Sequence, residues 1–295
     1  MSSVIRARDV RKSYGKGRTA LAGVNFDVAA GRIVGLMGPN GAGKTTALKA
    51  MLGLTPFDGE LSVLGRNPQR ERDALMQDVC FIADVAVLPK WMRVEHTLDF
   101  VAGVHPRFDR ARAEEVLAKT TIKLGSRVGQ LSKGMITQLH LALIMAIDAR
   151  LLILDEPTLG LDLLSRRALY ETLLNDYFDH ERTILITTHQ VEEIENLLTD
   201  VLFIRDGQIV LDATVDSLST RYAQLTVPRE RLSDAVSLGP IFTREVFGVS
   251  ALIYDTAKGA APTREQLSVL GELRTPSIAD LFVALMQPAD TRAAS

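Results

Sequence analysis

The sequence predicts an α/β protein built around a parallel sheet. Residues 32–37 form an apolar run that leads directly into a glycine-rich turn and then into a segment with helical spacing at 44–52. A second apolar run, at 151–154, ends in two carboxylates and is followed by alternating helical and strand-like segments. Buried strands that alternate with helices are typical of parallel sheets covered on both faces.

The composition and length are those of a globular protein with one large domain and one small one. Of the 295 residues, 46% are hydrophobic and 24% are charged, which excludes a disordered or collagen-like chain. The 34 Lys and Arg residues are balanced by 36 Asp and Glu residues, for a net charge of -2. Sequence-independent nucleic-acid binding needs an excess of cationic groups, so we expect no nucleic-acid partner.

Three features favour a reducing, cytoplasmic environment. The N-terminus has no apolar signal segment, and the single cysteine, Cys80, permits no disulfide within the chain. Cys80 lies in the apolar run 79–82, which predicts a small buried side chain on a strand. Apolar stretches such as 141–147 are far shorter than the roughly 18 residues needed to cross a bilayer. Any role at a membrane would therefore depend on a partner.

The order of elements follows from periodicity and turn residues. The first half predicts strands at 4–10, 24–28 and 32–37, helices at 44–52, within 97–119 and at 132–146, with Asp109 as a helix N-cap. The second half predicts a strand at 151–154, a helix at 165–178, a strand at 183–187, a helix at 191–198 and a hairpin of strands 201–205 and 208–211. Beyond a boundary near residue 221 we expect a strand at 246–254, a loop at 258–262 and an amphipathic helix at 278–286.

The glycine-rich turn carries the clearest chemical signal. It fits the pattern G-x-x-x-x-G-K-[ST] with Gly38, Pro39, Asn40, Gly41, Ala42, Gly43, Lys44, Thr45 and Thr46. Glycines let successive backbone N–H groups point at phosphate oxygens, and the following helix adds its dipole. Lys44 is placed to reach the β- and γ-phosphates of a nucleotide, and Thr45 to offer a hydroxyl to Mg²⁺. The position between a predicted strand and a helix favours this interpretation over an ordinary glycine turn.

Two acids, Asp155 and Glu156, end the apolar run at 151–154. A parallel strand delivers such residues to the edge of the sheet where α/β proteins bind ligands. Asp155 is suited to holding Mg²⁺ and Glu156 to polarising an attacking water. The alternative is a strand that ends in a solvated acidic turn, but the phosphate loop upstream favours the catalytic interpretation.

The segment Leu131-Ser132-Lys133-Gly134-Met135 resembles the L-S-G-G-Q signature of ATP-binding-cassette (ABC) ATPases. Lys133 and Met135 depart from that form, whereas Ser132 and Gly134, the pair expected to touch the γ-phosphate, are kept. Ser132 is also a good helix N-cap, which is compatible with contacting phosphate because both roles use a helix N-terminus.

Further similarities to this family follow in the family's order. Tyr14 matches the aromatic residue that stacks on adenine, and Asp162, in the segment 158–162, matches the loop that links two ATP sites. His189 matches the switch histidine over the γ-phosphate, and the predicted hairpin through Asp206-Gly207 matches the closing strands. A lone Tyr or His is usually structural, but the ordered set favours the family's roles.

One position departs from the family's pattern. ABC subunits usually carry a glutamine after an edge strand, where it senses Mg²⁺ and couples to the membrane partner. The matching position after the run 79–82 is Asp84. An aspartate can bind Mg²⁺ through an oxygen, or it can simply cap the loop that follows the strand.

The resemblance covers residues 4–221, and 275–282 looks like the closing segment of exporter-type subunits. It implies a core with an antiparallel β-subdomain and a helical subdomain near 90–145, within a domain at 1–221. A small α+β domain is expected at 222–295. The resemblance further implies ATP and Mg²⁺ as cofactors, a second copy of the chain that completes each ATP site, and an integral-membrane permease partner at the inner face of the membrane. The alternative is a soluble ABC ATPase that serves no transporter.

Overall fold

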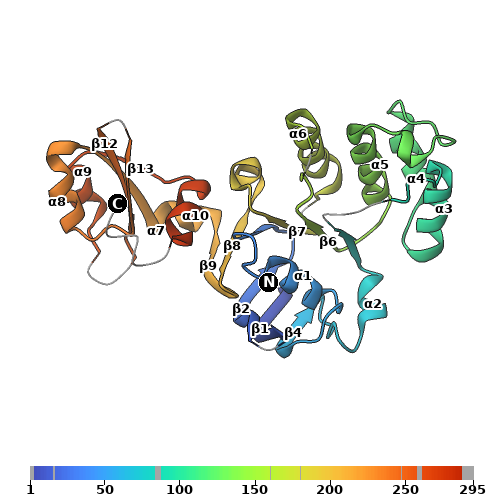
Figure 1. Ribbon diagram of the computed structural model, residues 1–295, viewed down its shortest axis with the longest axis horizontal. Helices are drawn as coiled ribbons and strands as arrows, with labels where there is room; N and C mark the ends of the chain where they lie inside the picture. Colours follow the sequence, from blue (N-terminus) through green and yellow to red (C-terminus); the bar gives the residue numbers. More distant parts are fainter. Residues whose placement is uncertain are drawn as a thin grey trace.

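The computed structural model describes residues 3–15, 17–83, 88–159, 161–179, 181–246, 248–257 and 261–287. The described residues form three separate sheets, with helices packed between and around them (Figure 1). The mixed α/β class predicted from the sequence is therefore confirmed.

A six-stranded sheet in the order β5-β6-β7-β3-β8-β9 occupies the centre of the molecule. Neighbouring strands run parallel except for β8 and β9, which form the hairpin predicted at Asp206-Gly207. Strands β3, β6 and β7 are buried along their whole length, as expected for a sheet covered on both faces. The bounds are β3 Ile33–Met37, β5 Val79–Ile82, β6 Leu151–Asp155, β7 Thr183–Thr188, β8 Asp200–Arg205 and β9 Gln208–Thr214.

The N-terminal strands form a second, antiparallel sheet in the order β2-β1-β4. Its strands are β1 Ser3–Tyr14, β2 Arg18–Ala29 and β4 Asp58–Val63. Both opening strands are longer than predicted, because pairing continues to Tyr14 opposite Arg18. The outer part of this hairpin is exposed and polar, so it carries no apolar alternation that a sequence pattern could detect.

Helices α1 Lys44–Met51 and α6 Leu163–Thr172 pack around the central sheet, and α2 Arg72–Met76 leads into β5. A π-helical turn, η2 Leu173–Tyr177, continues α6 and completes the predicted helix at 165–178. The predicted helix at 191–198 is wrong. That segment forms two 3₁₀ turns, η3 Val191–Glu193 and η4 Glu195–Leu197, separated at Ile194, where φ is -122°. Glu193 and Glu195 accept hydrogen bonds from Thr158 and Ala279, so tertiary contacts override helical propensity.

The inserted helices form a distinct layer with a buried cluster of their own. They are α3 Val94–Val104, α4 Arg110–Ala118, the 3₁₀ turn η1 Val128–Gln130 and α5 Lys133–Met145. As predicted, Asp109 caps α4, with its side chain accepting from the Arg112 N–H at 3.1 Å. A helical segment therefore lies where the sequence analysis expects one, near residues 90–145.

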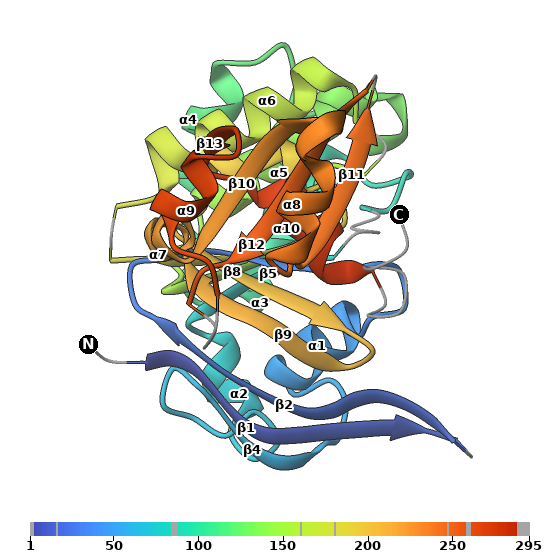
Figure 2. The ribbon, with the colours of Figure 1, turned by 90° about the vertical axis from the view of Figure 1, so that its left-hand side faces the viewer.

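The third sheet begins after α7 Val215–Arg221 and has the antiparallel order β11-β12-β10-β13. Helices α8 and α9 cover its outer face (Figures 1 and 2). The predicted strand at 246–254 is confirmed from residue 249 onward, as β12, but its start is wrong, because Gly248, with φ of 78°, lies between β11 and β12, which pair as a hairpin. The predicted loop at 258–262 lies mostly outside the described residues. The bounds are β10 Tyr222–Pro228, η5 Arg229–Arg231, α8 Leu232–Ser237, β11 Phe242–Val246, β12 Val249–Asp255, α9 Arg264–Ser268 and β13 Glu272–Arg274.

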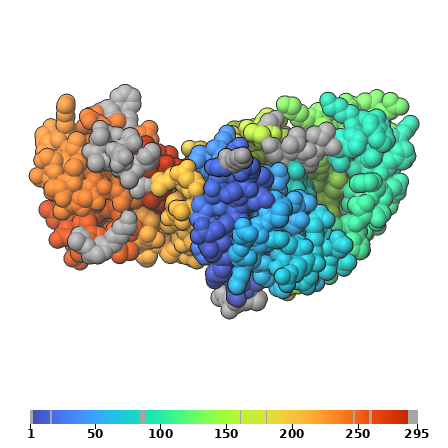
Figure 3. All heavy atoms as spheres, turned by 60° about the horizontal axis from the view of Figure 1, so that its bottom comes forward, coloured from blue at the N-terminus to red at the C-terminus, as the bar shows by residue number. Residues whose placement is uncertain are grey.

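The last described helix, α10 Ile278–Met286, matches its predicted bounds and packs against the central part of the molecule. Its apolar residues Ile278, Leu281 and Ala284 belong to the same buried cluster as residues of β7 and β8. The rings of Phe282 and Phe203 meet edge to face, with centroids 5.4 Å apart. Helix α10 therefore connects the C-terminal sheet to the central sheet by apolar packing. The C-terminal sheet lies at one end of the molecule and the inserted helices lie at the other (Figure 3).

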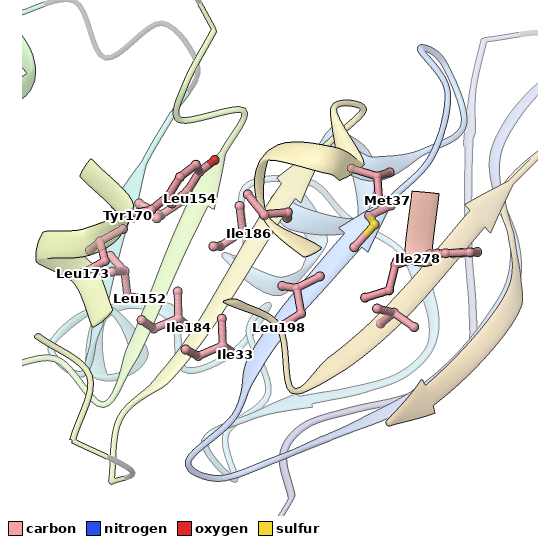
Figure 4. Packing of buried hydrophobic residues seen from close by; sticks show 14 of the residues in the cluster. Ile33, Met37, Leu152, Leu154, Tyr170, Leu173, Ile184, Ile186, Leu198 and Ile278 are labelled. Carbon is pink, nitrogen blue, oxygen red and sulfur yellow. The ribbon is translucent and has the colours of Figure 1, made fainter. Parts of the chain in front are cut away.

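The largest buried cluster lies on one face of the central sheet and includes Ile33, Met37, Leu152 and Ile184 (Figure 4). Cys80 belongs to it, as predicted, and burial raises the pKa of its thiol to about 12. The thiol therefore stays protonated at neutral pH. Among the helices within the described ranges, none has both the length and the apolar character needed to span a bilayer.

Replacing Leu281 with alanine tests the attachment of α10. The side chain is fully buried, so Leu281→Ala should lower the free energy of unfolding by about 2–5 kcal/mol, measured by urea denaturation. Val283→Ala, on the exposed side of the same helix, should change it by only about 0.5 kcal/mol. Equal effects of the two substitutions would mean that α10 is not anchored through Leu281.

Candidate active site

The loop from Gly38 to Thr46 connects the C-terminal end of β3 to the first turn of α1. Two of its glycines lie where no side chain fits. A Cβ on Gly38 would lie 2.3 Å from the Ile204 carbonyl oxygen, and a Cβ on Gly43 would lie 2.5 Å from that of Ala20. Gly43 is also the residue before α1 and has φ of 115°, in the region that favours glycine. The loop can therefore pack closely against its neighbours while the N-terminus of α1 stays open to a ligand.

Lys44 lies at the start of α1 and is held inside the loop. Its ammonium donates to the Gly38 carbonyl oxygen at 2.7 Å and lies 3.4 Å from Oε1 of Glu156. Only 6% of the Lys44 side chain is exposed. A buried ammonium of this kind, beside the dipole of a helix N-terminus, forms a positively charged site for phosphate groups.

Asp155 and Glu156 lie side by side at the end of β6 and are both positioned by Thr187 on β7. The Thr187 hydroxyl donates to Oδ1 of Asp155 at 2.5 Å. The Glu156 N–H donates to the Thr187 carbonyl oxygen at 3.1 Å. Glu156 has φ of 48°, in the left-handed region, which turns its side chain out of the strand's alternation. The two acids can therefore have different roles although they are adjacent in sequence.

His189, directly after β7, completes a chain of contacts. Its Nδ1 lies 3.0 Å from Oε2 of Glu156, whose other oxygen faces Lys44. The Glu156 carboxylate is thus placed between an imidazole and an ammonium. This arrangement leaves the carboxylate oriented and available to polarise a water molecule beside a bound phosphate.

The segment after His189 is braced by Arg166 of α6. Its guanidinium donates to the Leu161 carbonyl oxygen at 2.8 Å and to Oε1 of Gln190 at 3.1 Å, and it forms an ion pair with Glu193. These contacts connect the loop before α6 to the residues that follow the histidine, so both segments are held relative to Glu156.

A hollow of about 680 Å³ opens over the loop and contains these groups. Tyr14 lies at its rim, with 42% of its surface exposed and available to stack on a planar ring. Lys12 lies over the Tyr14 ring, 5.0 Å from its centroid. The residues that line the hollow are Tyr14, Arg18, Thr19, Ala20, Pro39, Asn40, Gly41, Gly43, Lys44, Thr45, Thr46, Lys49, Glu156, Leu159 and His189.

Five residues of this hollow were not predicted from the sequence: Arg18, Thr19, Ala20, Lys49 and Leu159. Two of them had a detectable signal. Lys49 follows Thr45 and Thr46 at helical spacing, which places the three on one face of α1. Arg18 pairs with Tyr14 across the first hairpin, but this could be found only once the strands were extended to their true ends.

Ser132, Gly134 and Asp162 do not line the hollow of their own chain, as far as the described residues show. Ser132 is the N-cap of α5, and its hydroxyl accepts from the Met135 N–H at 3.2 Å. Asp162 is the N-cap of α6, where hydrogen bonds from the Ser165 N–H and hydroxyl lower the pKa of its carboxyl. Asp84, the residue in place of the family's glutamine, lies outside the described residues.

The predicted metal ligands Thr45 and Asp155 have chemistry that fits Mg²⁺. Asp155 is 6% exposed and uses Oδ1 to accept from Thr187, while Oδ2 has no hydrogen-bond partner in the described part of the chain. No group of three or more His, Cys, Asp or Glu side chains that could hold a metal was found among the described residues. Mg²⁺ usually takes one or two protein ligands together with phosphates and waters, so the donors present suffice.

A parallel sheet with a phosphate loop, paired acids and a following histidine defines a P-loop ATPase. Residues 21–159 match the ABC transporter family. The chain is 37% identical over 224 residues to the Nod factor export ATP-binding protein I of Burkholderia lata, covering 72% of this chain and 71% of that protein. It is 33% identical to the same-named protein of Paraburkholderia xenovorans, covering 94% of both chains. A solved ATP-binding subunit of an ABC transporter aligns with a TM-score of 0.64 and 25% identity, over 74% of this chain and 92% of that one.

The chain therefore belongs to the ABC transporter family. It is an ATP-binding and ATP-hydrolysing subunit of an ABC transporter, and the fold expected from its sequence motifs is confirmed. These similarities favour a transporter subunit over the alternative of a soluble ABC ATPase without a transporter.

Proposed function

We propose that the chain hydrolyses ATP with Mg²⁺ and that two copies act together to drive a separate integral-membrane permease. The chain of contacts from Lys44 through Glu156 to His189 is the observation that carries this proposal. The direction of transport is outward, in keeping with the export proteins to which the chain is similar. The subunit acts at the cytoplasmic face of the membrane.

In the hydrolytic step, the residues of this chain mainly position groups and stabilise charge. The loop N–H groups and Lys44 hold the β- and γ-phosphates, and Tyr14 stacks on the adenine. Glu156 accepts a hydrogen bond from the attacking water, and His189 holds the carboxylate in place. Bound by Thr45 and Asp155, Mg²⁺ would neutralise charge on the phosphate oxygens.

The second copy is needed because Ser132 and Gly134 lie outside the hollow of their own chain. Ser132 caps the N-terminus of α5, and neither Ser132 nor Gly134 lines the hollow over the chain's own phosphate loop, so these residues are available to another copy's nucleotide. Leu163 and Leu164, beside Asp162, are 77% and 79% exposed, as expected of residues that a partner covers. ATP binding would then close the pair, and hydrolysis would reopen it.

Glu156→Gln should preserve ATP binding and lower turnover by about 10²–10⁴-fold, because the amide keeps the shape of the side chain but cannot act as a base. The variant should also accumulate as a dimer with ATP, seen as doubled mass in size-exclusion chromatography. Glu192→Gln, the same change at an exposed neighbouring position, should turn over like the parent. Near-normal turnover of Glu156→Gln would assign the water to another residue.

Mixing two inactive variants tests the shared sites. Ser132→Arg should abolish hydrolysis by obstructing the partner's nucleotide, and Lys44→Ala should abolish it in its own loop. A mixed dimer has one site with both defects and one with neither, so activity should partly return. Thr121→Arg, at an exposed position among the inserted helices, should by contrast stay active alone. Mixed dimers as inactive as either parent would contradict shared sites.

A further inference from the structure

A second hollow, of about 460 Å³, lies on the face of the C-terminal sheet that α8 and α9 leave uncovered. Side chains alternate between the faces of a strand, so Leu225 and Val227 of β10 pack toward those helices while Gln224 and Thr226 face the hollow. The lining residues are Gln224, Thr226, Phe242, Arg244, Val249, Ala251, Ile253, Glu272, Arg274 and Asp280.

The floor of this hollow is one row of paired residues across four strands. Arg244 of β11 pairs with Ala251, Ala251 with Thr226, and Thr226 with Glu272 of β13. The two central side chains are small, and this makes the row concave. The row thus ends in a cation, Arg244, on one edge strand and an anion, Glu272, on the other. The backbones of these two residues are about 14 Å apart, at three strand spacings of ~4.8 Å.

The two end charges are available to a ligand. Arg244 and Glu272 are exposed, and neither forms an ion pair with another residue that the structure describes. The neighbouring row supplies Phe242 and Ile253, which are 8% and 2% exposed and give the hollow an apolar wall. Opposite charges at the two ends and an apolar wall between them suit a small molecule of matching pattern.

The wall nearest the body is connected to α10. Gln224 is only 3% exposed. When its amide oxygen is turned toward Arg274, it accepts a hydrogen bond from Nη2 of Arg274 at 2.8 Å. The amide nitrogen then donates to Oδ2 of Asp280 at 3.3 Å. Asp280 lies in the first turn of α10, and the N–H of Ala279 donates to Oε2 of Glu195 at 3.3 Å. Glu195 lies six residues after His189, so a short path leads from this hollow to the ATP site.

We propose that this hollow is a regulatory site for a small amphoteric molecule that carries a carboxylate and an ammonium on a short apolar chain. Arg244 binds the carboxylate, Glu272 binds the ammonium, and Phe242 and Ile253 contact the methylene groups. Occupancy changes the position of α10 through Asp280, and Glu195 transmits the change to the segment after His189.

Calorimetric titration of the full chain tests the site with three probes of increasing length: 4-aminobutanoate, 6-aminohexanoate and 8-aminooctanoate. At least one should bind saturably, and hexanoate and hexylamine, which each lack one charge, should bind about tenfold or more weakly. Failure of all three probes to bind, or equal binding of the singly charged compounds, would overturn the proposal.

Charge-removing variants locate the binding. Arg244→Gln and Glu272→Gln should each weaken the best probe by about tenfold. Arg229→Gln and Glu230→Gln make the same changes at exposed positions of η5, outside the hollow, and should bind it like the parent. Equal affinities in all four variants would place the probe elsewhere.

The ATPase rate tests regulation separately from binding. Saturating the parent with the best probe should change kcat by about twofold or more, the lower end of ordinary coupling energies. Glu195→Ala removes the acceptor for α10 and should keep probe binding while losing most of this effect. Binding that leaves kcat unchanged would overturn the regulatory role. Probe binding is measured without ATP. A probe that does not bind is therefore distinguishable from a chain that does not hydrolyse ATP.

Discussion

The ion pair between Lys44 and Glu156 is the interaction on which the active site depends. Its two groups are 3.4 Å apart, with 6% and 14% of their side chains exposed. Charges shielded from water to this extent need partners, and each has a second one, the Gly38 carbonyl for Lys44 and His189 for Glu156. The strand order β6-β7-β3 meets this need, because the three strands deliver Glu156, His189 and the phosphate loop to one edge of the sheet.

Contacts from the other parts of the molecule hold this edge in place. The β8–β9 turn lies between the phosphate loop and β2, with the Gly207 N–H donating to Ala42 at 3.0 Å and the Gly207 carbonyl accepting from Ala22 at 2.8 Å. Thr187 fixes both acids, and Arg166 fixes the residues after the histidine. The N-terminal sheet, the terminal hairpin and α6 therefore all restrict movement of the phosphate site, whereas α10 extends the same framework to the C-terminal sheet.

The sequence was most informative where a segment's structure is determined by its own residues rather than by contacts with distant ones. The apolar runs at 33–37 and 151–154 form fully buried strands, and their apolar composition alone predicts this. The glycines Gly38 and Gly43 are required because neighbouring backbone atoms approach them closely. The 3₁₀ turns at 191–197 were not predictable, because Thr158, Arg166 and Ala279, all distant in sequence, hold them. Arg18 was missed for a similar reason, since its place in the hollow depends on strand register. The proposed contact of Ser132 and Asp162 with a nucleotide would involve a second chain, whereas a single chain shows only their N-cap hydrogen bonds.

ATP affinity of Lys44→Ala tests the central claim most directly. Isothermal calorimetry should show binding at least about 100-fold weaker than in the parent, a loss of ~2.7 kcal/mol, because the variant removes the buried ammonium placed to meet the β- and γ-phosphates. Lys12→Ala, which removes an ammonium only at the rim beside Tyr14, should bind within about threefold of the parent. Parent-like ATP affinity in Lys44→Ala would contradict the account, because the charged centre at the end of β6 would then not be the phosphate site.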